Sequence, residues 1–415
     1  MINIRFVLLP LLLFNFCTDT PKSNDIKEGM SIQRLSRIDN MLNKAIDSKE
    51  IPGAVALVKR NGKTVYQKSF GIANPDNNRV ISENDIFRIA SMTKAITSLA
   101  VLMLWEEGKF FLDDPISKYI PSFTEVGILD DFNPKDSTYT SIPPKNKITI
   151  RHLLTHTSGI GYGEIDGNPQ IRSIYWKRGL RDIFAPGQTM EEITNAIASQ
   201  PIHHEPGKRY TYSLGLDVLG YFVELMSGVT FSEFLRTRIF DPLDMKDTYF
   251  TLPEEKHKRL VPVLTRDGDE WAIYNSLFYD VNYPLKSKNF FSGGAGLSST
   301  VQDYAKFLNL FLNNGNSNGH QIIGKKTCEL VYENQMPENE DISHGLAFGV
   351  LLEKNLKIGT GGSEGTLTWG GYFNTSYFAD PKENIIGIIY KQTFNIGNDT
   401  TSQRFRELVF QALIE

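Results

Sequence analysis

The sequence predicts a mixed α/β fold in which one antiparallel sheet is built from both ends of the chain. Short apolar or alternating segments, typical of strands, occur within residues 53–70 and again within residues 348–390. The intervening part, about residues 91–319, has mostly helical periodicity. The simplest assembly pairs the two groups of strands, covers one face with the terminal helices, and inserts the helical region between them.

The N-terminal α/β part, about residues 30–90, contains a helix and a hairpin. Apolar residues at helical spacing between Ile32 and Ile46 predict an amphipathic helix. The segments 53–58 and 63–70 are strand-like, and Asn61-Gly62 between them is typical of a tight hairpin turn. This part is therefore expected to supply two adjacent strands and a covering helix.

The inserted part begins with a helix that is apolar on nearly every side. It starts near Ser91, continues to Trp105 and is followed by Gly108, so we expect it in the middle of the protein. Another apolar helix is expected from Leu216 to Met226. Residues 121–146 are rich in Pro, Asp, Ser and Thr and are expected to form a long polar loop.

The C-terminal α/β part, about residues 320–415, returns to strand patterns. Strands are expected at 348–352, 372–379 and 385–390. Apolar positions between Phe405 and Leu413 then predict a closing helix.

Composition excludes one broad class of function. The chain of 415 residues has a formal net charge of −4 and a pI of about 6.0, so it offers no basic field for nucleic acid. The two cysteines, Cys17 and Cys328, provide no disulfide framework for a mature chain, and Cys328 is expected to be a packed thiol.

The N-terminus resembles an export signal. Arg5 precedes an apolar segment at residues 6–16 that is too short to span a bilayer, so residues 1–17 are expected to be a signal peptide. Cys17 stands where a lipoprotein cysteine would be, although the bulky Phe16 before it is unusual there, and both lipid attachment and simple cleavage stay open. We expect one catalytic domain over residues 25–415, exported to the periplasm or outside the cell, with a membrane anchor as the alternative to a free protein.

Ser91 and Lys94 form the first candidate catalytic pair. Residues three apart lie on one face of a helix, and a helix N-terminus favours an oxyanion. Lys94 could serve as the base if burial lowered its pKa, because a desolvated ammonium loses its proton more easily. Tyr212 could complete a proton relay, although its position alone fits a half-buried aromatic residue equally well.

Other motifs compete with this pair. Ser363 lies in a Gly-x-Ser-x-Gly segment, but the last of the seven histidines is His344, so no triad histidine follows it. His152 and His156 are four residues apart without the glutamate of a metalloprotease helix, and the adjacent side chains of His203 and His204 diverge. We therefore predict neither a metal site nor a cofactor.

Several motifs together resemble the serine β-lactamase-related family, which includes class C β-lactamases, D-Ala-D-Ala carboxypeptidases and family VIII carboxylesterases. The resemblance covers about residues 30–415 and implies a β-lactamase/transpeptidase-like fold with its site between the two regions. The matching segments are Ser91–Lys94, Ile148–Gly159, Pro206-Gly207 followed by Tyr212-Ser213, Asp241–Met245 and Ser292–Ser299.

The resemblance also implies roles for individual residues. Ser91 would be the acylated nucleophile, and Lys94 and Tyr212 would activate it and protonate the leaving group. Trp369-Gly370-Gly371 would be the third family motif, and its glycines would let the backbone come close to the substrate. The backbone N–H groups of Ser91 and Tyr372 would form the oxyanion hole.

Two departures from the family pattern favour its esterase branch. Leu214 stands where the second motif carries asparagine, and Trp369 replaces the lysine of the third motif. An anionic β-lactam or D-Ala terminus would lose its polar anchors there, whereas a neutral small-molecule ester could pack on the indole. The expected function is a serine carboxylesterase; the alternatives are a β-lactamase or D-Ala-D-Ala carboxypeptidase, and a catalytically silent ligand-binding homologue.

Overall fold

The fold is taken from a computed structural model, which describes residues 25–180, 187–276, 280–338, 340–356, 361–397 and 399–414. The expected signal peptide, residues 1–17 including Cys17, lies outside the described residues. No single described helix is long and apolar enough to cross a membrane, although the bent pair Gly215–Ser227 and Phe231–Phe240 passes by length and composition alone.

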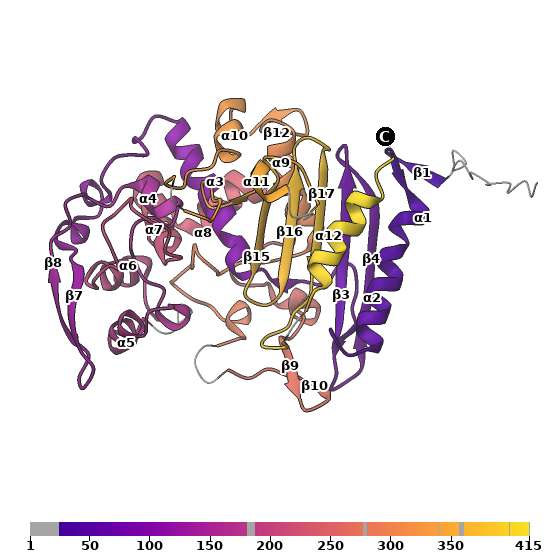
Figure 1. The fold of residues 1–415 in the computed structure, drawn as a ribbon, viewed down its shortest axis with the longest axis horizontal. Helices are drawn as coiled ribbons and strands as arrows, with labels where there is room; N and C mark the ends of the chain where they lie inside the picture. The colour runs from indigo at the N-terminus through magenta and orange to yellow at the C-terminus, as the bar shows by residue number, and fades with distance from the viewer. Residues whose placement is uncertain are drawn as a thin grey trace, which may run out of the picture.

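A seven-stranded antiparallel sheet forms the α/β region, and strands from both chain ends meet in it (Figure 1). In spatial order its strands are β14 (Gly349–Val350), β15 (Leu367–Gly371), β16 (Thr375–Asp380), β17 (Ile385–Tyr390), β3 (Gly53–Arg60), β4 (Lys63–Asn74) and β5 (Arg79–Val80). The junction is the β17–β3 pair, in which Ile388 lies opposite Leu57. The predicted fold class is confirmed.

The β3–β4 hairpin turns as its sequence predicts. Asn61 and Gly62 have φ values of 51° and 73°, the left-handed conformation that an Asn-Gly turn needs to match the strand twist. A register shift between Val58 and Lys59 marks a bulge just before the turn.

The terminal helices cover one face of the sheet. They are α1 (Ile32–Leu35), α2 (Arg37–Asp47) and α12 (Thr401–Gln411); in Figure 1 α12 lies in front of β17 and β3, and α2 lies along β4 with α1 at its end. Leu42 and Phe405 pack with Ala56, Val58 and Phe378 of the strands in one buried cluster. The opposite face packs on α9 (Val301–Leu312), so the sheet lies between two helical layers.

The inserted region is mostly helical and is centred on α3 (Thr93–Glu106). Every residue of α3 from Thr93 to Leu104 is buried, as the apolar sequence predicts. The remaining α-helices of this region are α4 (Ile150–Leu154), α5 (Pro169–Lys177), α6 (Met190–Ala198), α7 (Gly215–Ser227) and α8 (Phe231–Leu235), whereas α10 (Lys325–Val331) and α11 (Glu353–Leu356) belong to the C-terminal part. The small strand pairs are β1 (Ile26–Lys27) with β2 (Met30–Ser31), β6 (Phe87–Arg88) with β11 (Ser298–Ser299), β9 (Leu264–Asp267) with β10 (Glu270–Ile273), and β12 (Asn316–Ser317) with β13 (His320–Gln321).

Two expectations about strands were wrong. Residues 121–146 contain a β-hairpin of β7 (Ile128–Asn133) and β8 (Thr138–Ile142), and β8 is exposed at every position, so it lacks the apolar alternation that marks a strand. The strand expected at 372–379 begins only at Thr375, because Tyr372 lies in the turn after β15. The third motif is therefore the end of one strand rather than the start of another.

Candidate active site

Ser91 lies in a single 3₁₀ turn, Ala90–Met92, that leads directly into α3. Ala90 is buried and has φ 43°, a left-handed conformation that costs free energy for a residue with a Cβ. The turn is closed by the Met92 N–H, which donates to the Ile89 carbonyl at 3.0 Å. This arrangement presents Ser91, which is half-buried, at the head of a fully buried helix.

Lys94 lies one helical turn further on and is completely buried. Its Nζ donates to the Gly294 carbonyl at 2.8 Å and to the Tyr162 hydroxyl at 3.1 Å. The same Nζ is 5.0 Å from the ring centroid of Tyr162 and 4.6 Å from that of Tyr212. The amine is therefore held in one position by two acceptors and two aromatic faces.

Tyr212 connects Lys94 to the nucleophile. Its hydroxyl donates to Ser91 Oγ at 2.7 Å, and its ring stacks on Tyr162 with centroids 5.0 Å apart and planes 10° from parallel. The structure thus brings all three predicted catalytic side chains together, with Tyr212 in direct contact with Ser91. A contact of this length allows a proton to move between the two oxygens.

The third motif lies beside this group. Trp369 has its ring centroid 6.0 Å from that of Tyr212 and 5.1 Å from that of His344. A Cβ on Gly371 would lie 2.4 Å from the Ile89 carbonyl oxygen, so only glycine lets β15 approach the turn that carries Ser91. This close approach supports the predicted oxyanion hole, which stays a prediction.

Leu214 was expected to contact substrate, and the structure contradicts this. Its side chain is 1% exposed and belongs to the main hydrophobic core, where it precedes the first turn of α7. Its backbone N–H donates to the Gly161 carbonyl at 3.1 Å. Leucine at this position completes the core and does not line the site.

Two buried residues of the site, Tyr162 and Asp217, were not found from the sequence. Burial raises the pKa of Tyr162 well above its ordinary value, and Tyr212 and Asp217 nearby add to the effect. Burial likewise raises the pKa of Asp217, and the neighbouring Lys94 opposes that shift. One signal was available, because Asp217 is a lone acidic residue in the apolar first half of α7.

The competing serine and the histidines have structural partners instead. Ser363 forms the turn before β15, where its N–H donates to an Asp380 carboxylate oxygen at 2.6 Å. His156 contacts Ser213 through Nδ1, and His203 contacts Asp166 at 2.9 Å. Within the described ranges, no group of three His, Cys, Asp or Glu side chains could hold a metal ion. Cys328 is a buried free thiol whose pKa burial raises to about 12, as expected of a packed cysteine.

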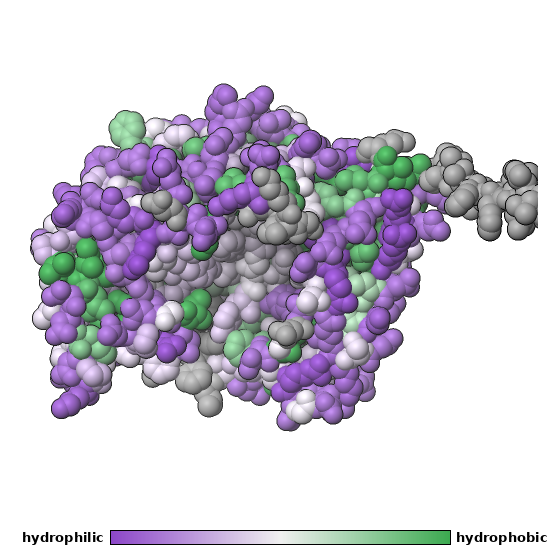
Figure 2. All heavy atoms as spheres, viewed as in Figure 1, coloured by the Kyte–Doolittle hydropathy of each residue, from purple (hydrophilic) through white to green (hydrophobic). Residues whose placement is uncertain are grey.

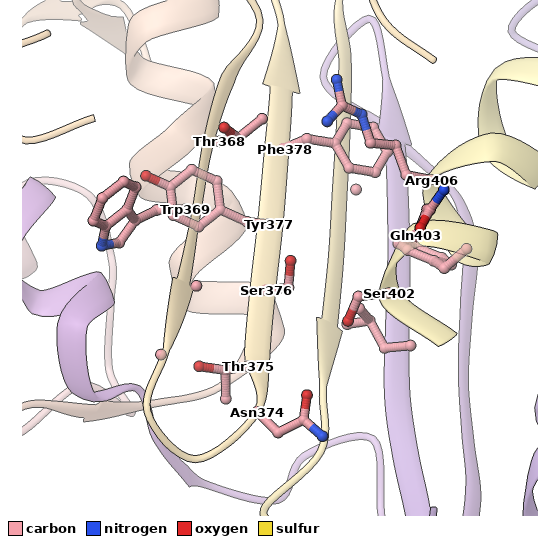
Figure 3. Close-up of a pocket in the computed structure, with 15 residues that line it drawn as sticks. Thr368, Trp369, Asn374, Thr375, Ser376, Tyr377, Phe378, Ser402, Gln403 and Arg406 are labelled. Atoms are coloured by element: carbon pink, nitrogen blue, oxygen red, sulfur yellow. The ribbon is translucent and has the colours of Figure 1, made fainter. Parts of the chain in front are cut away.

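Two grooves border part of the site, one at Trp369 and the other at Tyr212. One, of about 430 Å³, follows the outward side of β15–β17 beside α12 and has Trp369, Gly370 and Gly371 in its wall (Figure 3). Figure 2 shows this face of the molecule hollowed in its middle. The other, of about 640 Å³, has Tyr212 and Arg209 in its wall, together with the loop before α5.

Comparisons with known proteins bear on the family and the fold of the chain. A family model described as Beta-lactamase matches residues 38–409. Esterase EstB of Burkholderia gladioli is 30% identical over 361 residues, which are 83% of this chain and 87% of that protein. Lovastatin esterase of Penicillium rubens is 29% identical over 85% of this chain and 91% of its own length. The structure of EstCE1, a hydrolase with promiscuous acyltransferase activity, superposes with a TM-score of 0.78 at 24% identity and covers 91% of this chain and 99% of that one.

Proposed function

The chain belongs to the beta-lactamase family, and from that premise we propose that it is a carboxylesterase that forms an acyl-enzyme on Ser91. The observation that carries the proposal is the 2.7 Å contact between the Tyr212 hydroxyl and Ser91 Oγ, with Lys94 fixed beside the same tyrosine ring. Covalent catalysis requires a nucleophile that contacts a proton acceptor, and a third group that orients the acceptor. Ser91, Tyr212 and Lys94 have these relative positions.

Acylation follows from these contacts. Ser91 Oγ attacks the ester carbonyl while its proton passes to Tyr212, and the phenolic proton of Tyr212 passes on to the unprotonated amine of Lys94. The carbonyl oxygen becomes an oxyanion, which the backbone N–H groups of Ser91 and Tyr372 would stabilise. When the C–O bond to the alcohol breaks, Tyr212 gives its proton to the leaving oxygen and takes one back from Lys94. The products are a free alcohol and an acyl group on Ser91.

Deacylation repeats the same steps with water. Water attacks the acyl carbon, gives its proton to Tyr212, and Ser91 Oγ leaves with that proton restored. The net reaction is ester plus water to acid plus alcohol, and no cofactor takes part in it. An alcohol in place of water would give acyl transfer by the same route.

The proposed substrates are small, neutral esters. Trp369 and Tyr212 provide aromatic surface next to Ser91, and the position of the third-motif lysine carries an uncharged indole. An apolar acyl or alcohol group would pack on this surface without needing a charged partner. The names of the two curated relatives, an esterase and a lovastatin esterase, support the same class of substrate.

The test is hydrolysis of p-nitrophenyl butyrate by the purified protein and by Ser91→Ala, with nitrocefin as a parallel substrate. We expect ester hydrolysis that Ser91→Ala abolishes, and nitrocefin turnover at least about 100-fold slower. Unchanged ester hydrolysis in Ser91→Ala would refute the role of Ser91. Faster nitrocefin than ester turnover would identify a β-lactamase instead.

We also propose that the chain is exported, because residues 6–16 form an apolar segment after Arg5. Intact mass of the protein isolated from its native host should lack residues 1–16 or 1–17. A lipid mass on Cys17 would identify a lipoprotein, and a retained full-length N-terminus would contradict export by this route.

A further inference from the structure

Asp217 is a buried acidic residue that the steps above do not use. It lies in the first turn of α7 and is 1% exposed. Its Oδ1 accepts from the Ser292 hydroxyl and from the Gly294 N–H, the latter at 3.1 Å. Its Oδ2 is buried and has no hydrogen-bond partner among the described residues. A carboxylate that is buried with one oxygen unpaired costs free energy, which suggests a role in function.

Asp217 and Lys94 both hydrogen-bond to the backbone of Gly294, one to its N–H and the other to its carbonyl. The Lys94 Nζ donates to the Gly294 carbonyl at 2.8 Å, while the Gly294 N–H donates to Asp217. The loop has little freedom to move, because the Thr97 hydroxyl also donates to the Gly293 carbonyl at 2.7 Å. A Cβ on Gly294 would lie 2.4 Å from Asp217 Oδ2, so the loop touches the carboxylate directly.

We infer that Asp217 is a positioning residue for Lys94: it fixes the Gly294 carbonyl that orients the amine, and it places a negative charge next to it. The inference rests on the proposed function, because it assigns Asp217 a part in the proton relay of Ser91, Tyr212 and Lys94. It also explains why the segment Ser292–Ser299 is rich in glycine, since the loop must fit between α3 and α7.

The charge matters at the moment when Ser91 is activated. Proton transfer from Ser91 Oγ through Tyr212 leaves positive charge at Lys94, in a site with no water-exposed surface at that amine. A carboxylate nearby stabilises that charge and therefore the tetrahedral intermediate. Tyr162, whose hydroxyl accepts from Lys94, is also close to Asp217, and the buried imidazoles of His156 and His344 lie near the same amine. Asp217 is thus the acidic group whose charge acts on the lysine in this part of the site.

The test separates the hydrogen bonds of Asp217 from its charge. Asp217→Asn can still accept from Ser292 and Gly294 but is neutral, whereas Asp217→Ala loses both functions. For p-nitrophenyl butyrate we expect kcat to fall about 10-fold in Asp217→Asn and about 100-fold or more in Asp217→Ala, with KM within about threefold. In Asp217→Asn the acidic limb of the kcat/KM profile should move to lower pH by about one unit, because loss of an anion weakens proton binding nearby.

Asp303→Asn is the matched control. Asp303 on α9 is also buried, but it accepts from the Asp247 N–H and from Lys306, which lie outside the site. We expect this variant to alter thermal stability without moving the pH profile. Ser292→Ala keeps the Asp217 carboxylate and removes one hydrogen-bond donor to it. This variant should lower kcat without shifting the acidic limb of the pH profile. It replaces the Asp217 variants in the test if they do not fold.

The outcomes that overturn the inference differ from those that overturn the proposed function. If the wild-type protein hydrolyses esters through Ser91, but folded Asp217→Asn retains both its kcat and its pH profile, Asp217 is only structural. A kcat within about threefold of wild type in Ser292→Ala would contradict the positioning role independently. If the wild-type protein hydrolyses no ester at all, the proposed function itself fails first.

Discussion

Replacing Tyr212 with phenylalanine removes one hydroxyl from the contact that the proposed mechanism depends on most. Phenylalanine keeps the ring that stacks on Tyr162 at 5.0 Å and faces Lys94 at 4.6 Å, so the surrounding packing should persist. The change deletes the 2.7 Å hydrogen bond to Ser91 Oγ and the group that accepts its proton. Loss of a general acid–base group lowers rates by about 10²–10⁴, which corresponds to about 3–5 kcal/mol in the barrier.

The assay compares kcat/KM for p-nitrophenyl butyrate with the midpoint of thermal unfolding. We expect the rate to fall by about 10²–10⁴ while stability changes by about 1 kcal/mol, since a hydroxyl hydrogen bond of a half-buried tyrosine is lost. Tyr210→Phe, two residues away in the same loop, is the control and should retain activity within about twofold. Activity of Tyr212→Phe within about threefold of wild type would refute the relay through Tyr212.

Three further variants or conditions test other parts of the site. Gly371→Ala would place a methyl group 2.4 Å from the Ile89 carbonyl oxygen, so we expect esterase activity to fall about 100-fold. In the control Gly370→Ala the nearest atom to the methyl group would be 3.0 Å away, so this variant should lose less activity. Equal losses of activity in the two variants would contradict the steric explanation. Burial holds the pKa of His344 at about 4, below the value of about 6.5 in an unfolded chain. The contribution of neutral His344 to the free energy of unfolding is therefore fully present above pH 6.5 and is lost as the pH falls toward 4. Urea unfolding should show a loss of up to about 3 kcal/mol in the free energy of unfolding over this range. In His344→Gln this loss should be smaller. Trp369→Ala should raise KM for p-nitrophenyl hexanoate more than for the acetate, because only the longer chain reaches the indole; equal effects on both esters would remove Trp369 from substrate contact.

Local patterns were sufficient to predict the central helix and most of the sheet, apart from β15 and the start of β16. The Asn61-Gly62 turn joins two segments whose pairing needs no distant information, and residues 385–390 form a strand with the predicted bounds. The three catalytic candidates were also found from the sequence, because Ser91 and Lys94 share a helical turn and Tyr212 belongs to a motif of the resembled family. Their direct contact came only from the structure, since Tyr212 lies in the loop before α7, 121 positions from Ser91.

The missed residues act through contacts between distant segments. Lys94 is held by Tyr162 and Gly294, which lie 68 and 200 positions away along the chain. Neither periodicity nor a local motif indicates such partners. Leu214 was misplaced for a related reason, because a position in a motif does not reveal whether its side chain faces the substrate or the core. Burial is decided by tertiary packing, which a pattern in one segment does not contain.

The central claim is that Ser91, and not Ser363, carries the acyl group. Protein treated with a fluorophosphonate probe, or quenched rapidly during turnover of a slow p-nitrophenyl ester, should gain one adduct mass, and peptide mapping should locate it on the peptide containing Ser91. We predict full labelling in Ser363→Ala and none in Ser91→Ala. Ser363→Ala should fold normally, because the Ser363 backbone N–H makes the contact with Asp380 in the turn before β15. An adduct on Ser363, or labelling that survives in Ser91→Ala, would contradict the account.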